Sequence, residues 1–77
     1  MLTATISLAS VEQVKRFAHI ARKFDFDVAL SEGRYRADGK SILGIFCLNL
    51  ARPLRMDIHH DDPQEFLSQI QEFLCRT

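Results

Sequence analysis

The side chains that could carry chemistry in this chain are three histidines, two cysteines and two serines placed where helices should begin: His19, His59, His60, Cys47, Cys75, Ser10 and Ser41. A nucleophilic enzyme needs its nucleophile, base and orienting group in a spacing that lets them meet. No such spacing is found among these residues. The sequence therefore does not predict an enzyme.

The histidines do not predict a metal site. His59-His60-Asp61-Asp62 carries metal-capable side chains, but neighbouring residues of a strand point to opposite faces and Asp62 is expected to cap a helix. His19 falls in the middle of a helical pattern beside Arg16 and Lys23, as a solvated surface residue would. We expect neither a metal nor another cofactor.

The cysteines lead us to expect a cytosolic protein, and the charge balance bears on its partners. Cys47 and Cys75 have no Cys-x-x-Cys spacing and fit reduced thiols better than a disulfide framework. Ten basic and ten acidic residues give zero formal net charge, so no basic stripe indicates nucleic acid. The longest apolar run, Ile42 to Leu50, is much shorter than the ~20 residues that span a bilayer, and no signal peptide precedes the first strand. We expect no nucleic-acid or membrane partner.

Periodicity predicts the elements that position these side chains. Strands are indicated where apolar and polar residues alternate: Leu2–Leu8, Asp25–Leu30, Tyr35–Ala37 and Leu54–His59. Helices are indicated by apolar residues at helical spacing after a capping residue: Val11–Phe24 after Ser10, Ile42–Leu50 after Ser41, and a last helix through Leu74 after Asp62 and Pro63. Gly33 supplies a turn between the second and third strands.

The order of elements predicts an α+β fold over a single domain, residues 1–77. Its order is β-α-β-β-α-β-α, which favours a mostly antiparallel four-stranded sheet covered by helices on one face. We expect the uncovered face of the sheet to be exposed to solvent, a wet face. Suitable side chains for that face are Thr3, Thr5, Asp25, Asp27, Arg55 and Asp57.

Two stretches resemble HPr, the small histidine-containing phosphocarrier of the bacterial sugar phosphotransferase system. Lys40-Ser41-Ile42-Leu43-Gly44, preceded by Asp38-Gly39 and followed by Leu48, resembles the regulatory-serine segment of that family. Phe17 to Phe24 is similar to its first helix, and the two patterns run together without a gap from Phe17 to Leu50. The resemblance implies the HPr-like open-faced β-sandwich, a four-stranded antiparallel sheet with three helices.

The family's phosphoacceptor motif, Gly-Leu-His-Ala-Arg-Pro, is missing. Its histidine position holds Ser10, its arginine position holds Glu12 and its proline position holds Gln13. Serine has no imidazole nitrogen to form a labile phosphoramidate, and Glu12 would repel the phosphoryl group. Ala51-Arg52-Pro53 does not replace the motif, because it lacks a histidine and falls between a helix and a strand.

These features predict a non-catalytic, HPr-like regulatory or protein-binding module. The resemblance implies that Ile42, Leu43 and Phe46, together with the start of the helix at Val11, contact a partner protein. It also implies Ser41 as a phosphorylation site for a serine kinase, while a plain helix cap accounts for the same residue. The alternative is a phosphocarrier whose acceptor has moved to His19, His59 or Ser10.

Overall fold

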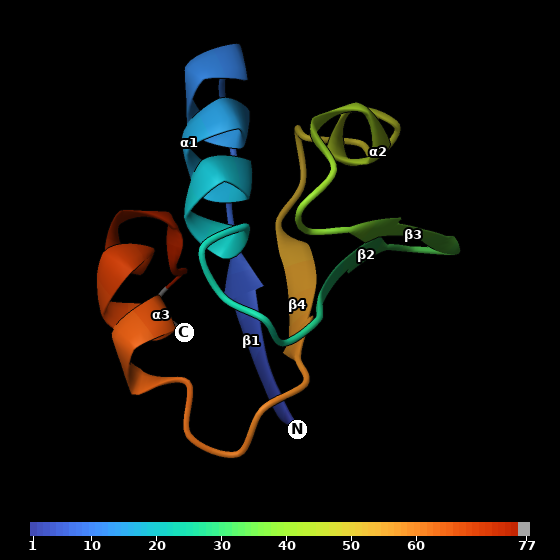
Figure 1. The fold of residues 1–77 in the computed structure, drawn as a ribbon. Helices are drawn as coiled ribbons and strands as arrows, with labels where there is room; N and C mark the ends of the chain where they lie inside the picture. The colour runs from blue at the N-terminus through green and yellow to red at the C-terminus, as the bar shows by residue number, and fades with distance from the viewer. Residues whose placement is uncertain (76–77) are drawn as a thin grey trace.

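The computed structural model describes residues 1–75 of the 77-residue chain. The elements follow the predicted order, with one short 3-10 helix, η1, added at the end (Figure 1). They are β1 Leu2–Ile6, α1 Val11–Ala21, β2 Val28–Glu32, β3 Tyr35–Asp38, α2 Ile42–Phe46, β4 Leu54–Ile58, α3 Gln64–Gln69 and η1 Gln71–Phe73.

The four strands form one antiparallel sheet in the order β1-β4-β2-β3. All the helices lie on the same side of this sheet, which leaves the other side uncovered (Figure 1). The predicted α+β class and open-faced sandwich are therefore confirmed. Residues after η1 extend the edge of β1, because the Cys75 N–H donates to the Thr5 carbonyl at 2.9 Å.

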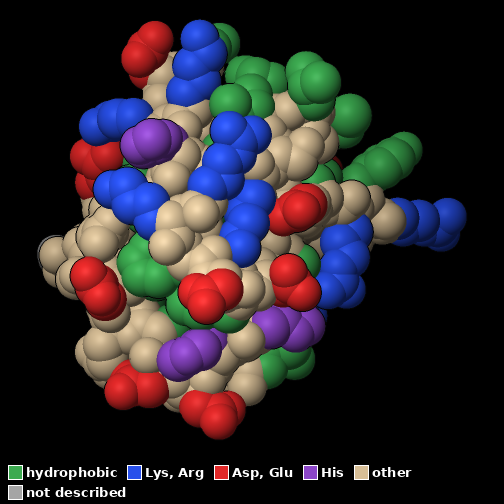
Figure 2. Space-filling view, in the orientation of Figure 1, with side chains coloured by type: hydrophobic (Ala, Val, Ile, Leu, Met, Phe, Trp, Pro, Cys, Tyr) green, Lys and Arg blue, Asp and Glu red, His purple; other side chains and the backbone are tan. Residues whose placement is uncertain are grey.

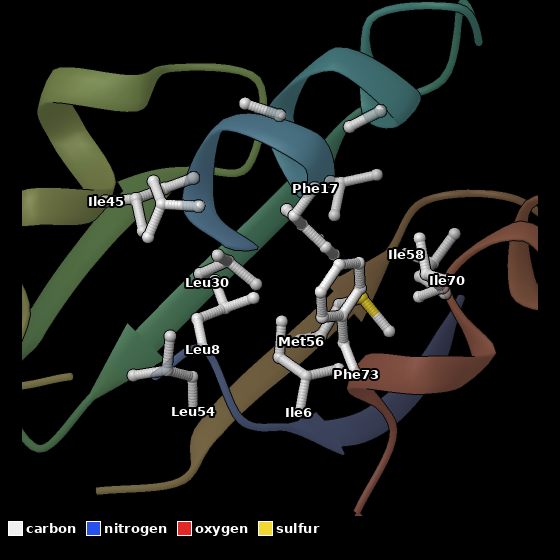
Figure 3. Packing of buried hydrophobic residues seen from close by; sticks show 14 of the residues in the cluster. Ile6, Leu8, Phe17, Leu30, Ile45, Leu54, Met56, Ile58, Ile70 and Phe73 are labelled. Atoms are coloured by element: carbon white, nitrogen blue, oxygen red, sulfur yellow. The ribbon is translucent and has the colours of Figure 1, made fainter. Parts of the chain in front are cut away.

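The core lies between the sheet and the helices, as period-two strands and amphipathic helices require. Phe17 of α1 packs edge to face against Phe66 and Phe73, with ring centroids 6.2 Å and 6.0 Å apart. Figure 3 shows side chains from α1, α2 and the C-terminal segment meeting those of the strands; the labelled ones are Ile6, Leu8, Phe17, Leu30, Ile45, Leu54, Met56, Ile58, Ile70 and Phe73.

Four predicted boundaries are wrong by a few residues. The first strand ends at Ile6, although Leu8 is still fully buried, and α1 ends at Ala21 instead of Phe24. The second helix ends at Phe46 and is followed by turns. The last helix divides into α3 and η1 at Ile70. In each case the apolar residues beyond the boundary still pack against the core, so periodicity alone extended the element too far.

The second strand begins later than predicted. Asp25 and Phe26 form bends, and β2 starts at Val28 and continues through Glu32. Phe24 and Phe26 turn toward Phe66, with centroid distances of 5.4 Å and 5.7 Å, and this packing holds the segment out of the sheet. The turn between β2 and β3 has Gly33 at φ 58°, as predicted for a glycine in this turn.

Asp57 departs from the prediction of a wet face. It lies on the uncovered side of the sheet with Thr3 and Arg55, as expected, but only 7% of its surface is exposed. Thr3 and Arg55 cover it and both hydrogen-bond its carboxylate. The uncovered face therefore carries a buried charged group at its centre.

Candidate functional site

The start of α1 is a closed helix cap. Ser10 has extended backbone angles, and its Oγ accepts the backbone N–H of Gln13 at 3.2 Å. Gln13 reaches back, and its Oε1 accepts the backbone N–H of Ala9 at 2.6 Å. The predicted cap at Ser10 is thus present, and it resembles a capping box in which Ala9 takes the place of Ser10 as the second donor.

This cap has the wrong chemistry for holding a phosphoryl group on histidine. The hydroxyl of Ser10 is occupied as an acceptor, and no imidazole stands beside it. Glu12 lies exposed in the first turn of α1, where a carboxylate complements the positive end of the helix. A phosphate arriving there would meet that negative charge.

Ser41 caps α2 as predicted. Its Oγ accepts the backbone N–H of Gly44 at 3.1 Å, and the residue is half-buried. A Cβ on Gly44 would lie only 3.2 Å from this oxygen, so the absence of a side chain at position 44 lets the cap close. The hydroxyl oxygen acts as an acceptor in this bond, which leaves its own hydrogen free to donate.

Two basic side chains hold the segment before Ser41. Arg22 Nε donates to the Lys40 carbonyl at 2.8 Å, which brings the end of α1 against the start of α2. Lys40 Nζ donates to the Phe24 carbonyl at 2.6 Å. The Lys40 ammonium is therefore bound to the segment after α1, and the guanidinium of Arg22 is the cation fixed to the residue next to Ser41.

The exposed part of α2 is apolar. We call Ile42, Leu43 and Phe46 the α2 surface: Leu43 is 81% exposed, Phe46 is 41% exposed, and Ile42 is half-buried and packs against the core. The opposite side of the same segment is anchored by Ile45, which is fully buried. Large exposed apolar side chains on a helix that is otherwise fixed in the core are typical of contact surfaces.

Val11 extends this surface. It is the first residue of α1 and is 53% exposed. The first turn of α1 and α2 lie at the same end of the molecule in Figure 1, and hydrophobic side chains gather at that end in Figure 2.

The three histidines are not brought together. His19 is exposed near the end of α1, and His59 is exposed after β4. The His60 ring packs on Phe26 with centroids 4.8 Å apart, and its Nδ1 accepts the backbone N–H of Asp62 at 3.0 Å. Within residues 1–75 no three metal-binding side chains form a cluster.

The predicted cap at Asp62 is wrong. Pro63 occupies the capping position of α3, and no side chain caps that helix. The backbone N–H of Asp62 is engaged by His60, which sets the turn before the helix in place of a side-chain cap.

The remaining candidates are isolated. Cys47 is exposed and Cys75 is half-buried, and neither forms a disulfide. Arg52 lies in the turn after α2 and approaches Glu32 at 3.8 Å, far from the start of α1 in the sequence. In the described part of the chain, none of the helices has the length and apolar character needed to cross a membrane.

The sequence matches no protein-family model and no curated protein. Solved structures, however, share the fold. HPr-C-His from Thermoanaerobacter tengcongensis superposes with a TM-score of 0.77 at 20% identity, covering 94% of this chain and 89% of that one. HPr from Bacillus anthracis gives 0.71 at 17% identity, covering 96% of both chains.

Crh, a Bacillus subtilis catabolite repression protein, gives a TM-score of 0.65 at 22% identity, covering 92% of this chain and 88% of its own. These likenesses span nearly the whole chain and agree with the strand order and the helices described above. The chain has the HPr-like fold.

Proposed function

We propose that this chain is a non-catalytic, HPr-like protein-binding module of the cytosol, which contacts a partner protein through the α2 surface and the first turn of α1. One observation carries the proposal: Leu43 and Phe46 are exposed on a segment whose other side, at Ile45, is locked into the core. An apolar surface held in a fixed shape loses little conformational entropy when it binds.

The start of α1 supports a binding role over a carrier role. Ser10 and Gln13 close the cap on each other, and Glu12 places a negative charge at the helix end. No histidine lies at the start of α1 to accept a phosphoryl group. Crh, which has the same fold, is described as a catabolite repression protein, and this also favours a regulatory role.

Ser41 is the proposed control point. Its Oγ lies at the start of α2, one residue before the α2 surface, and the Arg22 guanidinium is bound to the neighbouring residue. Phosphorylation would add a doubly charged group beside Ile42 and Leu43, and this charge would oppose burial of the α2 surface against an apolar partner.

The binding role is tested by affinity capture from lysate of the source organism, followed by measurement of the affinity for each captured protein. We expect Leu43→Ser combined with Phe46→Ser to abolish binding of the specific partner. Tyr35→Ser is the matched control, because Tyr35 is 68% exposed at the start of β3, by the tight turn that follows β2. Equal binding by all three proteins would refute the proposal.

Regulation by phosphorylation of Ser41 is tested with ATP and the kinase fraction of the same lysate. We expect one acid-stable phosphoryl group on the wild type and none on Ser41→Ala, and a weaker affinity of the phosphorylated protein for the captured partner. Phosphorylation at other serines only, or an unchanged affinity, would remove Ser41 from the proposal and leave the α2 surface untouched.

A further inference from the structure

A pocket of about 470 Å³ opens at the other end of the molecule from α2, between the segment after α1 and the start of α3. Its walls combine three aromatic rings with three carboxylates: Phe24, Phe26, His60, Asp25, Asp62 and Glu65. Its volume is in the range of cavities that hold small ligands or single side chains. No Lys or Arg is among its lining residues.

The aromatic wall is built on the core. The rings of Phe24 and Phe26 lie 5.4 Å apart, and His60 continues the row at 4.8 Å from Phe26. Both phenylalanines rest edge-on against Phe66, which is fully buried. The phenylalanines are only partly covered, so this wall presents aromatic surface in a fixed arrangement.

The carboxylates on the pocket rim are not neutralised from within. Among residues 1–75, no cationic group lies within 4.0 Å of the carboxylates of Asp25, Asp62 or Glu65, and no N–H or O–H group donates to them. Figure 2 shows acidic and histidine side chains along the lower part of the molecule, around small hydrophobic areas, while the basic side chains lie higher.

Helix electrostatics explain only part of this arrangement. Glu65 lies in the first turn of α3, where a carboxylate complements the helix dipole. Asp25, however, belongs to the bend after α1. It lines the same pocket although it lies far from α3 in the sequence. The Lys40 ammonium is not among the lining groups; it is held by the backbone carbonyl of Phe24.

We propose that this pocket binds an organic cation of the alkylammonium class, with its alkyl groups against Phe24 and Phe26 and its charge facing Asp25, Asp62 and Glu65. Aromatic faces attract a cation through the ring quadrupole, and nearby carboxylates add direct charge attraction. Two sources have this chemistry, a free small amine and a lysine side chain of a protein. The site is separate from the α2 surface and goes beyond the proposed function.

The test is an NMR titration of the isotope-labelled full chain with two cationic probes. The first is choline, and 3,3-dimethylbutan-1-ol is its neutral control of the same shape. The second is a glycine-flanked peptide with a single lysine, and the same peptide with norleucine is its control. We expect saturable shifts of backbone amides in residues 24–26 and 60–65 with a cation and not with its neutral control.

Asp62→Asn combined with Glu65→Gln should weaken binding about tenfold or more, because it removes two of the three charges on the rim. Glu12→Gln combined with Glu32→Gln is the matched control, since it removes two negative charges outside the pocket and should leave binding unchanged. Phe26→Leu keeps an apolar side chain but removes the ring, and should also weaken binding.

Saturable binding of choline assigns the site to a free amine, and binding of the lysine peptide alone assigns it to a protein side chain. The proposal is overturned by the absence of saturation with both cations, by equal shifts from the neutral controls, or by equal affinity of the pocket variant and the matched control. If the pocket double variant does not fold, the Phe26→Leu protein and the neutral controls decide the result. Loss of α2-surface binding would not change any of these outcomes.

Discussion

The hydroxyl of Thr3 donates a hydrogen bond to Oδ1 of Asp57 at 2.9 Å, across the pair of strands β1 and β4. The same oxygen accepts from Arg55 Nε at 3.1 Å. Because the sheet register places Thr3 directly opposite Asp57, the two residues meet without any distortion of the strands. A carboxylate is thereby held charged on a part of the sheet that no helix covers.

This contact predicts acid sensitivity of the fold. The hydrogen bond from Thr3, followed by the hydrogen bond and charge of Arg55, lowers the pKa of Asp57 below its usual 3.8, against the opposing effect of burial. The folded state then gains stability above that pH and loses it as the pH falls through the lowered pKa. We expect the free energy of unfolding to decline below about pH 4.

Thr3→Val tests that assignment, because it keeps the β-branched shape and removes the donor. We expect a loss of about 1 kcal/mol at neutral pH, and a smaller difference from the wild type in acid. Thr5→Val is the matched control, since Thr5 lies on the same strand and face with no side-chain hydrogen bond to a described residue. Urea unfolding over a pH series measures both, and parallel pH profiles of Thr3→Val and wild type would contradict the prediction.

The α2 segment predicts a sharp contrast between two apolar residues two positions apart. Ile45→Ala should cost about 2–5 kcal/mol, because it opens a cavity beside fully buried neighbours. Leu43→Ala should change stability by less than about 0.5 kcal/mol, because its side chain is already in solvent. Thermal unfolding measures both, and a large loss from Leu43→Ala would show that the residue serves the core and not a contact surface.

Local chemistry explains which features could be predicted from the sequence. The caps at Ser10 and Ser41 depend on residues three positions apart, so the spacing of the residues is sufficient to find them. The fourth strand follows from alternation within Leu54–Ile58. The family resemblance supplied the sheet with three helices, which the described structure has.

Features that depend on distant residues could not be found in this way. Asp57 is buried because β1 lies beside β4, and no local pattern reports that pairing. Asp25 and Phe26 lie outside the sheet because Phe24 and Phe26 pack on Phe66, about forty positions later in the chain.

Gly39 gives a prediction about close backbone approach. A Cβ at position 39 would lie 2.9 Å from Val28 Cγ1 and 3.0 Å from the Val28 carbonyl oxygen, which already accepts the Gly39 N–H at 2.7 Å. We expect Gly39→Ala to lower stability by about 1–3 kcal/mol. Gly33→Ala, which meets no atom within 4 Å, should cost only about 1 kcal/mol for its positive φ.

A double-mutant cycle separates the contact of position 39 with the Val28 γ-methyl group from its other contacts with Val28. Val28→Ala removes both γ-methyl groups, including the Cγ1 contact, but leaves the carbonyl oxygen and Cβ of Val28 in place. We therefore expect the combined cost of Val28→Ala and Gly39→Ala to be smaller than the sum of the single costs. Strict additivity, measured by urea unfolding, would mean that the contacts with the carbonyl oxygen and Cβ of Val28 account for the requirement for glycine.

The last prediction concerns phosphoryl transfer, which distinguishes the proposed binding module from a carrier with a relocated acceptor. We expect no added phosphoryl mass after incubation with phosphoenolpyruvate and the upstream phosphotransferase, read by intact mass at neutral pH. A histidine acceptor needs donors that hold the transferred group, and His19 lies in the last turn of α1, where the helix presents carbonyls and not N–H groups. His59 follows a strand, and the hydroxyl of Ser10 is engaged in the helix cap.

Authentic HPr in the same reaction is the positive control. An acid-labile phosphoryl group on this chain would contradict the prediction, and its loss in His19→Gln or His59→Gln would identify the acceptor. An acid-stable group in this reaction would instead point to a serine ester, because phosphoramidates hydrolyse in acid and serine esters do not.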